Sequence, residues 1–150
     1  MLCVIIVVMG SLMSNLRSYS ELITIDNYND RFKYLEIGGD VGVATFGFDR
    51  YLNQRFYKTS EWRKLRSEII VRDNGCDLGV DGYEIGGLII VHHINTVSVD
   101  DIKHKRFTLL LNPEYLISTS LNTHNAIHYG DETLLTSLPL ERRPNDTKLW

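Results

Sequence analysis

All five histidines fall between residues 92 and 128, and four of them form two pairs of different spacing. The approach to His92-His93 is the apolar, β-branched stretch 88–91, which is typical of a strand. His124 and His128 are four residues apart, so on a helix they project from one face. Because imidazole is the commonest protein ligand for transition metals, we expect a fold that brings this strand and this helix together around a metal ion.

Adjacent residues on a strand point to opposite faces, so His92 and His93 cannot both ligate one ion unless the strand is distorted. One of the two should face the metal and the other the substrate. A bound metal polarises a phosphoryl oxygen and neutralises the departing oxygen, while a neutral imidazole takes a proton from the attacking water. In this chain three of the histidines could hold the ion and the fourth could be the base that phosphodiester hydrolysis needs. A metalloprotease is disfavoured, because Asn125 follows His124 and breaks the His-Glu-x-x-His pattern.

The net charge of −3 hides a segregation of charge along the chain. Residues 50–72 hold seven cations and two anions, whereas residues 73–101 hold six anions and no Lys or Arg. A local basic patch can bind phosphates even when the whole protein is acidic. The alternative is that the two stretches are the solvated faces of a helix and a loop. Charge alone favours this second interpretation.

The first residues and the cysteines bear on location. Leu2–Met9 is apolar but too short to span a bilayer, and no Lys or Arg precedes it as in a signal peptide. It is a buried strand, a weak secretion signal, or translated upstream sequence with Met13 as the true start, which we favour. Cys3 and Cys76 form no CxxC pair and no disulfide framework. We therefore expect a cytoplasmic protein with no membrane partner.

The remaining pattern predicts a single α+β domain of mixed helices and short strands. Ser60 is expected to cap a helix whose inward stripe is Trp62, Leu65 and Ile69, and Gly130 is expected to end the last helix. The expected elements are helices over 29–37, 48–57, 60–72 and 121–129, a strand or extended loop over 41–48, a strand-turn-strand unit over 83–94, a loop or short irregular helix over 95–111, and a strand over 115–119.

Three stretches resemble the HNH endonucleases, whose core is the ββα-metal (His-Me finger) motif. They are Trp62–Cys76, which is similar to the helix and turn before the motif, Val91–Ile94, which is similar to its first strand, and Leu111–His128, which is similar to its closing block. The resemblance covers about residues 57–130. The His-His and His-x-x-x-His arrangement is most similar to the nuclease domains of colicins, and the chain from about Ser18 onward resembles small HNH proteins of bacteriophages.

The resemblance implies a role for each histidine. His92, His124 and His128 would hold the metal and His93 would be the general base, in an enzyme that leaves a 3′-hydroxyl and a 5′-phosphate. The ion would be divalent zinc, nickel, manganese or magnesium, and three imidazoles favour a transition ion. DNA would be the partner, and the residues expected to contact its backbone are Arg55, Lys58, Arg63, Lys64 and Arg66.

The chain departs from the family pattern in two respects. It has no CxxC pairs for a structural zinc, so its fold must rest on a hydrophobic core. Tyr115 occupies the usual position of the middle Asn, which orients the base in the family, and Asn112 lies three residues earlier. We expect Asn112 to take over this catalytic role. The alternatives are that the Tyr115 hydroxyl does so, that the base is held less firmly, or that Asn112 is merely the turn residue before Pro113.

These inferences divide the chain into a leader over 1–13, a helical or extended N-terminal extension over 14–56, an HNH nuclease core over 57–130 and a tail over 131–150. The expected function is a metal-dependent DNA endonuclease, cytoplasmic in a bacterial host if phage-encoded, and either a monomer or a homodimer. A second hypothesis is a non-catalytic nucleic-acid-binding or phage assembly module that keeps the metal for stability. In a third, the histidines are structural and bind no metal.

Overall fold

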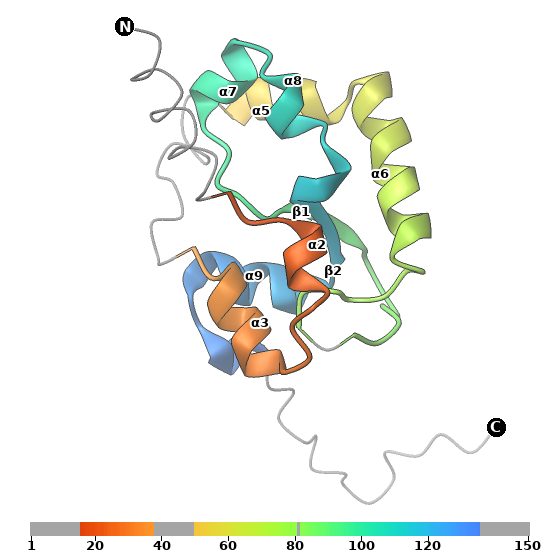
Figure 1. Ribbon diagram of the computed structural model, residues 1–150. Coiled ribbons are helices and arrows are strands. Elements are labelled where there is room, and N and C mark those ends of the chain that lie inside the picture. Colours follow the sequence, from red (N-terminus) through yellow and green to blue (C-terminus); the bar gives the residue numbers. More distant parts are fainter. Residues whose placement is uncertain (1–15, 38–49, 81, 136–150) are drawn as a thin grey trace, which may run out of the picture.

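The computed structural model describes residues 16–37, 50–80 and 82–135, and over these ranges the expected α+β class is confirmed. Figure 1 shows helices on both sides of a small two-stranded antiparallel sheet. The elements are α2 (Tyr19–Leu22), α3 (Tyr28–Leu35), α5 (Arg50–Tyr57), α6 (Ser60–Arg72), β1 (Ile90–His93), α7 (Val99–Lys103), α8 (Phe107–Leu110), η1 (Pro113–Tyr115), β2 (Leu116–Thr119), α9 (Leu121–Tyr129) and η2 (Glu132–Leu135). Within these ranges, none of the helices combines the length and the hydropathy needed to cross a bilayer.

The two strands come from distant parts of the sequence. β1 pairs with β2, and the register places His92 opposite Ile117 and His93 opposite Leu116. The strand-turn-strand unit expected over 83–94 is therefore wrong, since only Ile90–His93 is a strand and Glu84 forms an isolated bridge with Cys76. The physical reason is burial. Residues of β2 are fully enclosed and give β1 an apolar partner, whereas most of 82–88 is exposed.

The core lies on both faces of this sheet. On one face Trp62, Leu65 and Ile69 of α6 pack in a cluster with Val91 and Leu116. This confirms the inward stripe expected from their spacing. On the other face the cluster is made of residues from α2, α3, α9 and the sheet, namely Leu22, Leu35, Ile94, Ile117 and Ile127. Leu22 and Leu35, from the expected N-terminal extension, thus share a core with Ile94, which directly follows β1, and with Ile117 of β2.

Helix ends follow local hydrogen bonding. Thr59, not Ser60, is the N-cap of α6, because its hydroxyl accepts a bond from the Trp62 amide at 3.3 Å. α9 begins after Ser120, and Gly130 ends it as expected, in the left-handed conformation with φ of 63°. The expectations for 2–9 and 41–48, and the tail from 136 onward, lie outside the described residues.

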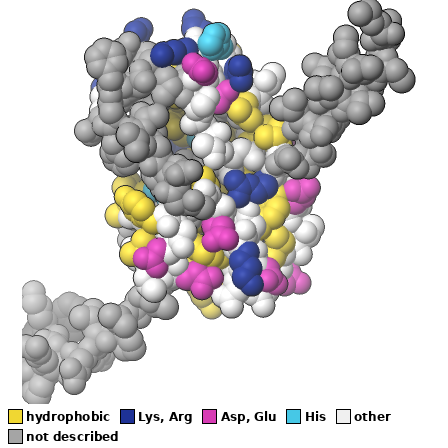
Figure 2. Space-filling model, turned by 90° about the vertical axis from the view of Figure 1, so that its left-hand side faces the viewer, with side chains coloured by type: hydrophobic (Ala, Val, Ile, Leu, Met, Phe, Trp, Pro, Cys, Tyr) yellow, Lys and Arg dark blue, Asp and Glu magenta, His cyan; other side chains and the backbone are white. Residues whose placement is uncertain are grey.

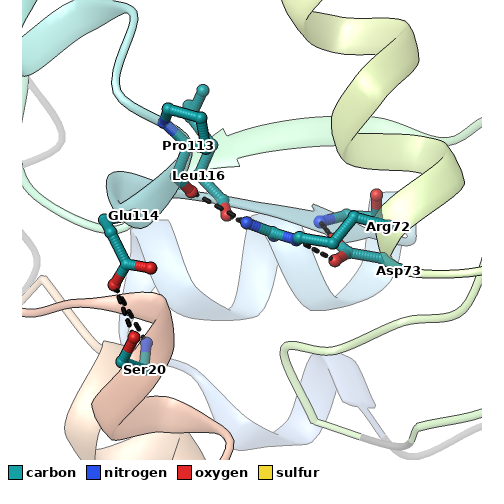
Figure 3. Close-up of polar contacts among 7 residues, drawn as sticks. Ser20, Arg72, Asp73, Pro113, Glu114 and Leu116 are labelled. Carbon is teal, nitrogen blue, oxygen red and sulfur yellow. Dashed lines mark hydrogen bonds and ion pairs between the residues drawn. The ribbon is translucent and has the colours of Figure 1, made fainter.

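Arg72 belongs to the basic stretch but is used inside the fold. Figure 3 shows its guanidinium donating to the carbonyl oxygens of Pro113 and Leu116 and pairing with Asp73. Its Cζ also lies 3.7 Å from the centre of the Tyr19 ring, a cation–π contact. Arg72 therefore joins the end of α6 to α2 and to the start of β2.

The acidic stretch is not simply a solvated loop, because its first two carboxylates are buried. Asp77 accepts hydrogen bonds from the amides of Gly79, Val80 and Ser120 and from the Thr123 hydroxyl. Two of these donors belong to the first turn and cap of α9, so the carboxylate fixes where that helix begins. Gly79 is required beside it, since a Cβ there would lie 2.5 Å from Cγ2 of Thr123.

Candidate metal centre

Three of the predicted ligands meet between β1 and α9. His92, His124 and His128 each offer one ring nitrogen, and these three nitrogens lie within 4.8 Å of one another. The ring centroids are 5.3 Å apart for His92 and His124, 5.0 Å for His92 and His128, and 4.4 Å for His124 and His128. The strand thus contributes one histidine of its pair, and the helix contributes both of its own.

The nitrogens at this centre have the character of metal ligands. Nε2 of His92 and Nδ1 of His124 are buried and have no hydrogen-bond partner among the described residues. A buried polar atom without a partner is costly, and a metal ion would satisfy both lone pairs at once. The residues present therefore fit a bound ion. The set has the three protein ligands of catalytic zinc sites, and imidazole suits zinc or nickel better than magnesium, which prefers oxygen.

All three rings are held in the neutral form that a metal requires. Burial lowers the pKa of His92 well below its usual range, and the neighbouring histidines lower it further. Burial lowers the pKa of His124 to about 4, assisted by His128, and burial also lowers the pKa of His128. At neutral pH the lone pairs of this centre are therefore available to a cation rather than occupied by protons.

His93 lies on the opposite face of β1, as the alternation of a strand requires. Its ring stacks on the indole of Trp62, with centroids 5.3 Å apart and planes at 16°. Its Nε2 lies 3.0 Å from the carbonyl oxygen of Leu110. Because a carbonyl only accepts hydrogen bonds, Nε2 carries the proton and Nδ1 keeps the lone pair. Burial lowers the pKa of His93 to about 4, although the bond to Leu110 opposes this shift.

One cavity of about 620 Å³ connects the two faces. Its lining includes the three candidate ligands and His93, which are joined there by Tyr57, Trp62, Arg63, Arg66, Asn125 and Tyr129. In the described part of the chain β1 pairs along one edge only, with β2, so the other edge can open to this cavity. A substrate there would have access both to the candidate metal centre and to His93.

The five candidate DNA-contacting cations fall into two groups. Arg63 and Arg66 line the cavity, and Nη2 of Arg66 donates to the carbonyl of Ile89 at 2.8 Å. The exposed Arg55, Lys58 and Lys64 are not among the residues that line it. Figure 2 shows Lys and Arg side chains at one end of the molecule beside a histidine, with acidic groups among them there and elsewhere on that face. The structure thus brings two of the five cations to the histidines.

A second group of cations was overlooked by the sequence reasoning. Lys103, Lys105 and Arg106 are exposed around the turn between α7 and α8, beside His104. The available signal was the run Lys-His-Lys-Arg over 103–106. It directly follows the stretch 73–101 with its six anions, so the charge balance of this region did not point to it. His104 is exposed, and its Nδ1 lies 2.8 Å from the carbonyl oxygen of Asp100.

The side chain of Asn112 is not brought to the cavity. Its Oδ1 accepts the amide of Glu114 at 3.0 Å and so caps η1, which corresponds to the turn-residue alternative. Tyr115 contributes its carbonyl, which accepts the amide of Ile94 at 2.9 Å just beyond the sheet. The polar group that hydrogen-bonds the His93 ring is instead the carbonyl of Leu110. A backbone acceptor leaves no signature in side-chain identity, so sequence reasoning could not find it.

No protein-family model, curated protein or solved structure matches this chain.

Proposed function

We propose that this protein is a metal-dependent DNA endonuclease of the HNH type, in which β1, β2 and α9 form a ββα-metal core. The observation that carries the proposal is the placement of three converging imidazoles and a fourth, separate imidazole around one cavity. His92, His124 and His128 would hold a divalent ion. When bound, the ion would polarise a phosphoryl oxygen and neutralise charge on the departing oxygen.

His93 would be the general base in this proposal. Its Nε2 proton is committed to the Leu110 carbonyl, so Nδ1 is the atom that can accept a proton from an attacking water. Since its pKa is lowered to about 4, the ring is unprotonated at neutral pH and ready to accept. The fixed tautomer supports this assignment, because a base whose two nitrogens exchanged roles would present a lone pair only part of the time.

The cations supply the affinity for DNA. Arg63 and Arg66 would contact phosphates next to the one being cleaved, because they line the same cavity as the histidines. Three exposed cations would contact the backbone farther away, namely Arg55 on α5, Lys58 between α5 and α6, and Lys64 on α6. Contacts of this kind are made to phosphates and carry no sequence information. We therefore propose binding that depends strongly on salt and weakly on sequence.

A plasmid-nicking assay tests the proposal directly. Metal-stripped protein is supplied separately with Mg²⁺, Mn²⁺, Ni²⁺ and Zn²⁺, beside the His93→Ala variant and the matched control His104→Ala at an exposed histidine. We expect nicking that requires a metal, disappears in His93→Ala and persists in His104→Ala. If His93→Ala nicks DNA at the rate of the unmodified protein, His93 is not the general base.

A second function is favoured by one observation. The side chain of Asn112 caps η1 and is not available to orient the base, so the centre could serve stability alone. The protein would then be a metal-stabilised nucleic-acid-binding or assembly module. The same samples distinguish the two, because a rise in melting temperature with metal, without nicking by any of the four ions, would favour the module.

A further inference from the structure

Trp62 lies against His93 in a different arrangement from its other aromatic contacts. The indole and the imidazole are stacked nearly parallel, at 16° and 5.3 Å, so a flat face of one ring covers a flat face of the other. The other aromatic contacts of Trp62 are steeper, with interplanar angles of 45° to Phe56 and 72° to Tyr57. Stacked and edge-on contacts are both ordinary between aromatic rings, but of these three contacts only the stack with His93 lays a flat face of the indole along the other ring.

The stack and one hydrogen bond together restrict the imidazole. Rotation about the Cβ–Cγ bond would either swing the ring off the indole or exchange the positions of its two edges. The bond from Nε2 to the Leu110 carbonyl opposes that exchange, and the indole opposes the swing. Both partners are themselves fixed, because Trp62 is 4% exposed within the α6 core cluster and Leu110 is fully buried.

We propose that Trp62 is a positioning residue for His93, holding the ring so that Nδ1 presents its lone pair to the cavity. The inference rests on the proposed role of His93 as a base, although the position of the ring can be measured without any activity. Misplacement of a reacting group by about 1 Å can cost about 100-fold in rate. A side chain that fixes this ring therefore affects the rate of cleavage rather than the affinity for DNA.

Three variants test the inference. Trp62→Leu keeps an apolar side chain but removes the flat face, Trp62→Phe restores a smaller face, and Ile69→Ala damages the same core cluster two turns farther along α6. We expect the single-turnover rate of Trp62→Leu to fall about 10- to 100-fold at saturating DNA, with little change in the DNA concentration giving half-maximal rate. Trp62→Phe should recover most of that rate, and Ile69→Ala should retain it despite a lowered melting temperature.

A second readout needs neither metal nor DNA. Long-range ¹H–¹⁵N spectra of the His93 ring, assigned by their loss in His93→Ala, should report a protonated Nε2 and an unprotonated Nδ1 in the unmodified protein. In Trp62→Leu we expect a mixture of the two tautomers. An unchanged tautomer together with an unchanged rate would overturn the inference, as would an equal loss of rate in Ile69→Ala. If the unmodified protein nicks with none of the four ions, the proposed function fails, and the spectra alone decide whether Trp62 positions the ring.

Discussion

The rings of His92 and His128 meet edge to face, with centroids 5.0 Å apart and planes at 88°. One ring belongs to β1 and the other to the last turn of α9, so the contact joins the sheet to the helix. With the third ring of His124 beside them, the nitrogens cannot all be protonated, because like charges at this separation repel strongly. A divalent cation and protons therefore compete for the same site.

Metal binding should stabilise the folded protein. An ion that binds only the folded state at 100 times its Kd adds about 2.7 kcal/mol to the free energy of unfolding. For a domain of this size we expect that gain to raise Tm by several degrees in Zn²⁺ or Ni²⁺, measured by calorimetry on metal-stripped protein. The variant His128→Ala should lose the rise, because two imidazoles remain at the site.

The control for this prediction is His104→Ala, which removes an exposed histidine that caps the carboxyl end of α7. It should show the same metal-induced rise in Tm as the unmodified protein. An equal rise in His128→Ala would mean that the ion binds elsewhere, and the three-histidine centre would lose its assignment.

Stability without metal should depend on pH in the acidic range. The pKa values of His93 and His124 are each lowered from 6.5 to about 4 in the folded protein, chiefly by burial. The unfolded chain therefore binds more protons than the folded one between these limits, and stability is lost as pH falls from about 6.5 towards 4. Each histidine contributes at most about 1.4 kcal/mol per pH unit in this window. Urea unfolding of chelator-treated protein at pH 7.5, 6 and 5 measures the slope.

His93→Gln serves as the comparison for this pH series, because it removes one of the histidines whose pKa the fold lowers and keeps a polar side chain. Its urea midpoint should fall less steeply with acidification than that of the unmodified protein. Identical slopes in both proteins would show that His93 is not kept neutral by the fold.

The carboxylate of Asp77 should be essential to the position of α9. Oδ2 accepts from the Ser120 amide and the Thr123 hydroxyl, and Oδ1 accepts from two further amides. In Asp77→Asn one of these acceptors becomes an NH₂ group that faces donors, so we expect a loss of about 3 kcal/mol in the free energy of unfolding. Because α9 carries two of the three candidate ligands, Zn²⁺ affinity measured by titration should fall as well. The exposed Asp26→Asn variant should change neither quantity.

The sequence was most informative where a local pattern has one physical meaning. The spacing of His124 and His128 and the glycine that follows predicted both the helix and the shared direction of the rings. The alternation of a strand likewise predicted that His92 and His93 face opposite sides. Each of these inferences needs only the geometry of a single element.

Inferences that needed a partner from elsewhere in the chain did less well. Nothing in the sequence over 83–94 indicates that β1 pairs with the distant residues 116–119 and not with the segment directly before it. In the sequence Asp73 and Asp77 look like ordinary loop residues. In the fold their carboxylates accept hydrogen bonds from backbone amides of β2 and of the N-cap of α9. The position of Arg72 in a basic stretch likewise did not indicate that its guanidinium donates hydrogen bonds to the carbonyls of Pro113 and Leu116, before and at the start of β2. Long-range hydrogen bonds of this kind are set by the assembled fold and not by local propensity.

Two cations on α6 provide a matched test of the interface with DNA. Arg66 lines the cavity and Lys64 does not, although they lie two residues apart on one helix and carry the same charge. A hydrogen bond to a charged group is worth about 1.5–3 kcal/mol, so Arg66→Gln should reduce DNA cleavage about 10- to 100-fold, whereas Lys64→Gln should change it little. For duplex DNA, each lost phosphate contact should also reduce the slope of log Kd against log salt by about 0.9. Because the glutamine amide ends about where Nε of arginine lies, it is too short to replace the Nη2 bond to the Ile89 carbonyl, so the melting temperature of Arg66→Gln is measured beside its cleavage rate. Equal effects of the two substitutions on cleavage and on the salt slope would show that the charge of α6 acts diffusely and that the cavity is not where the backbone binds.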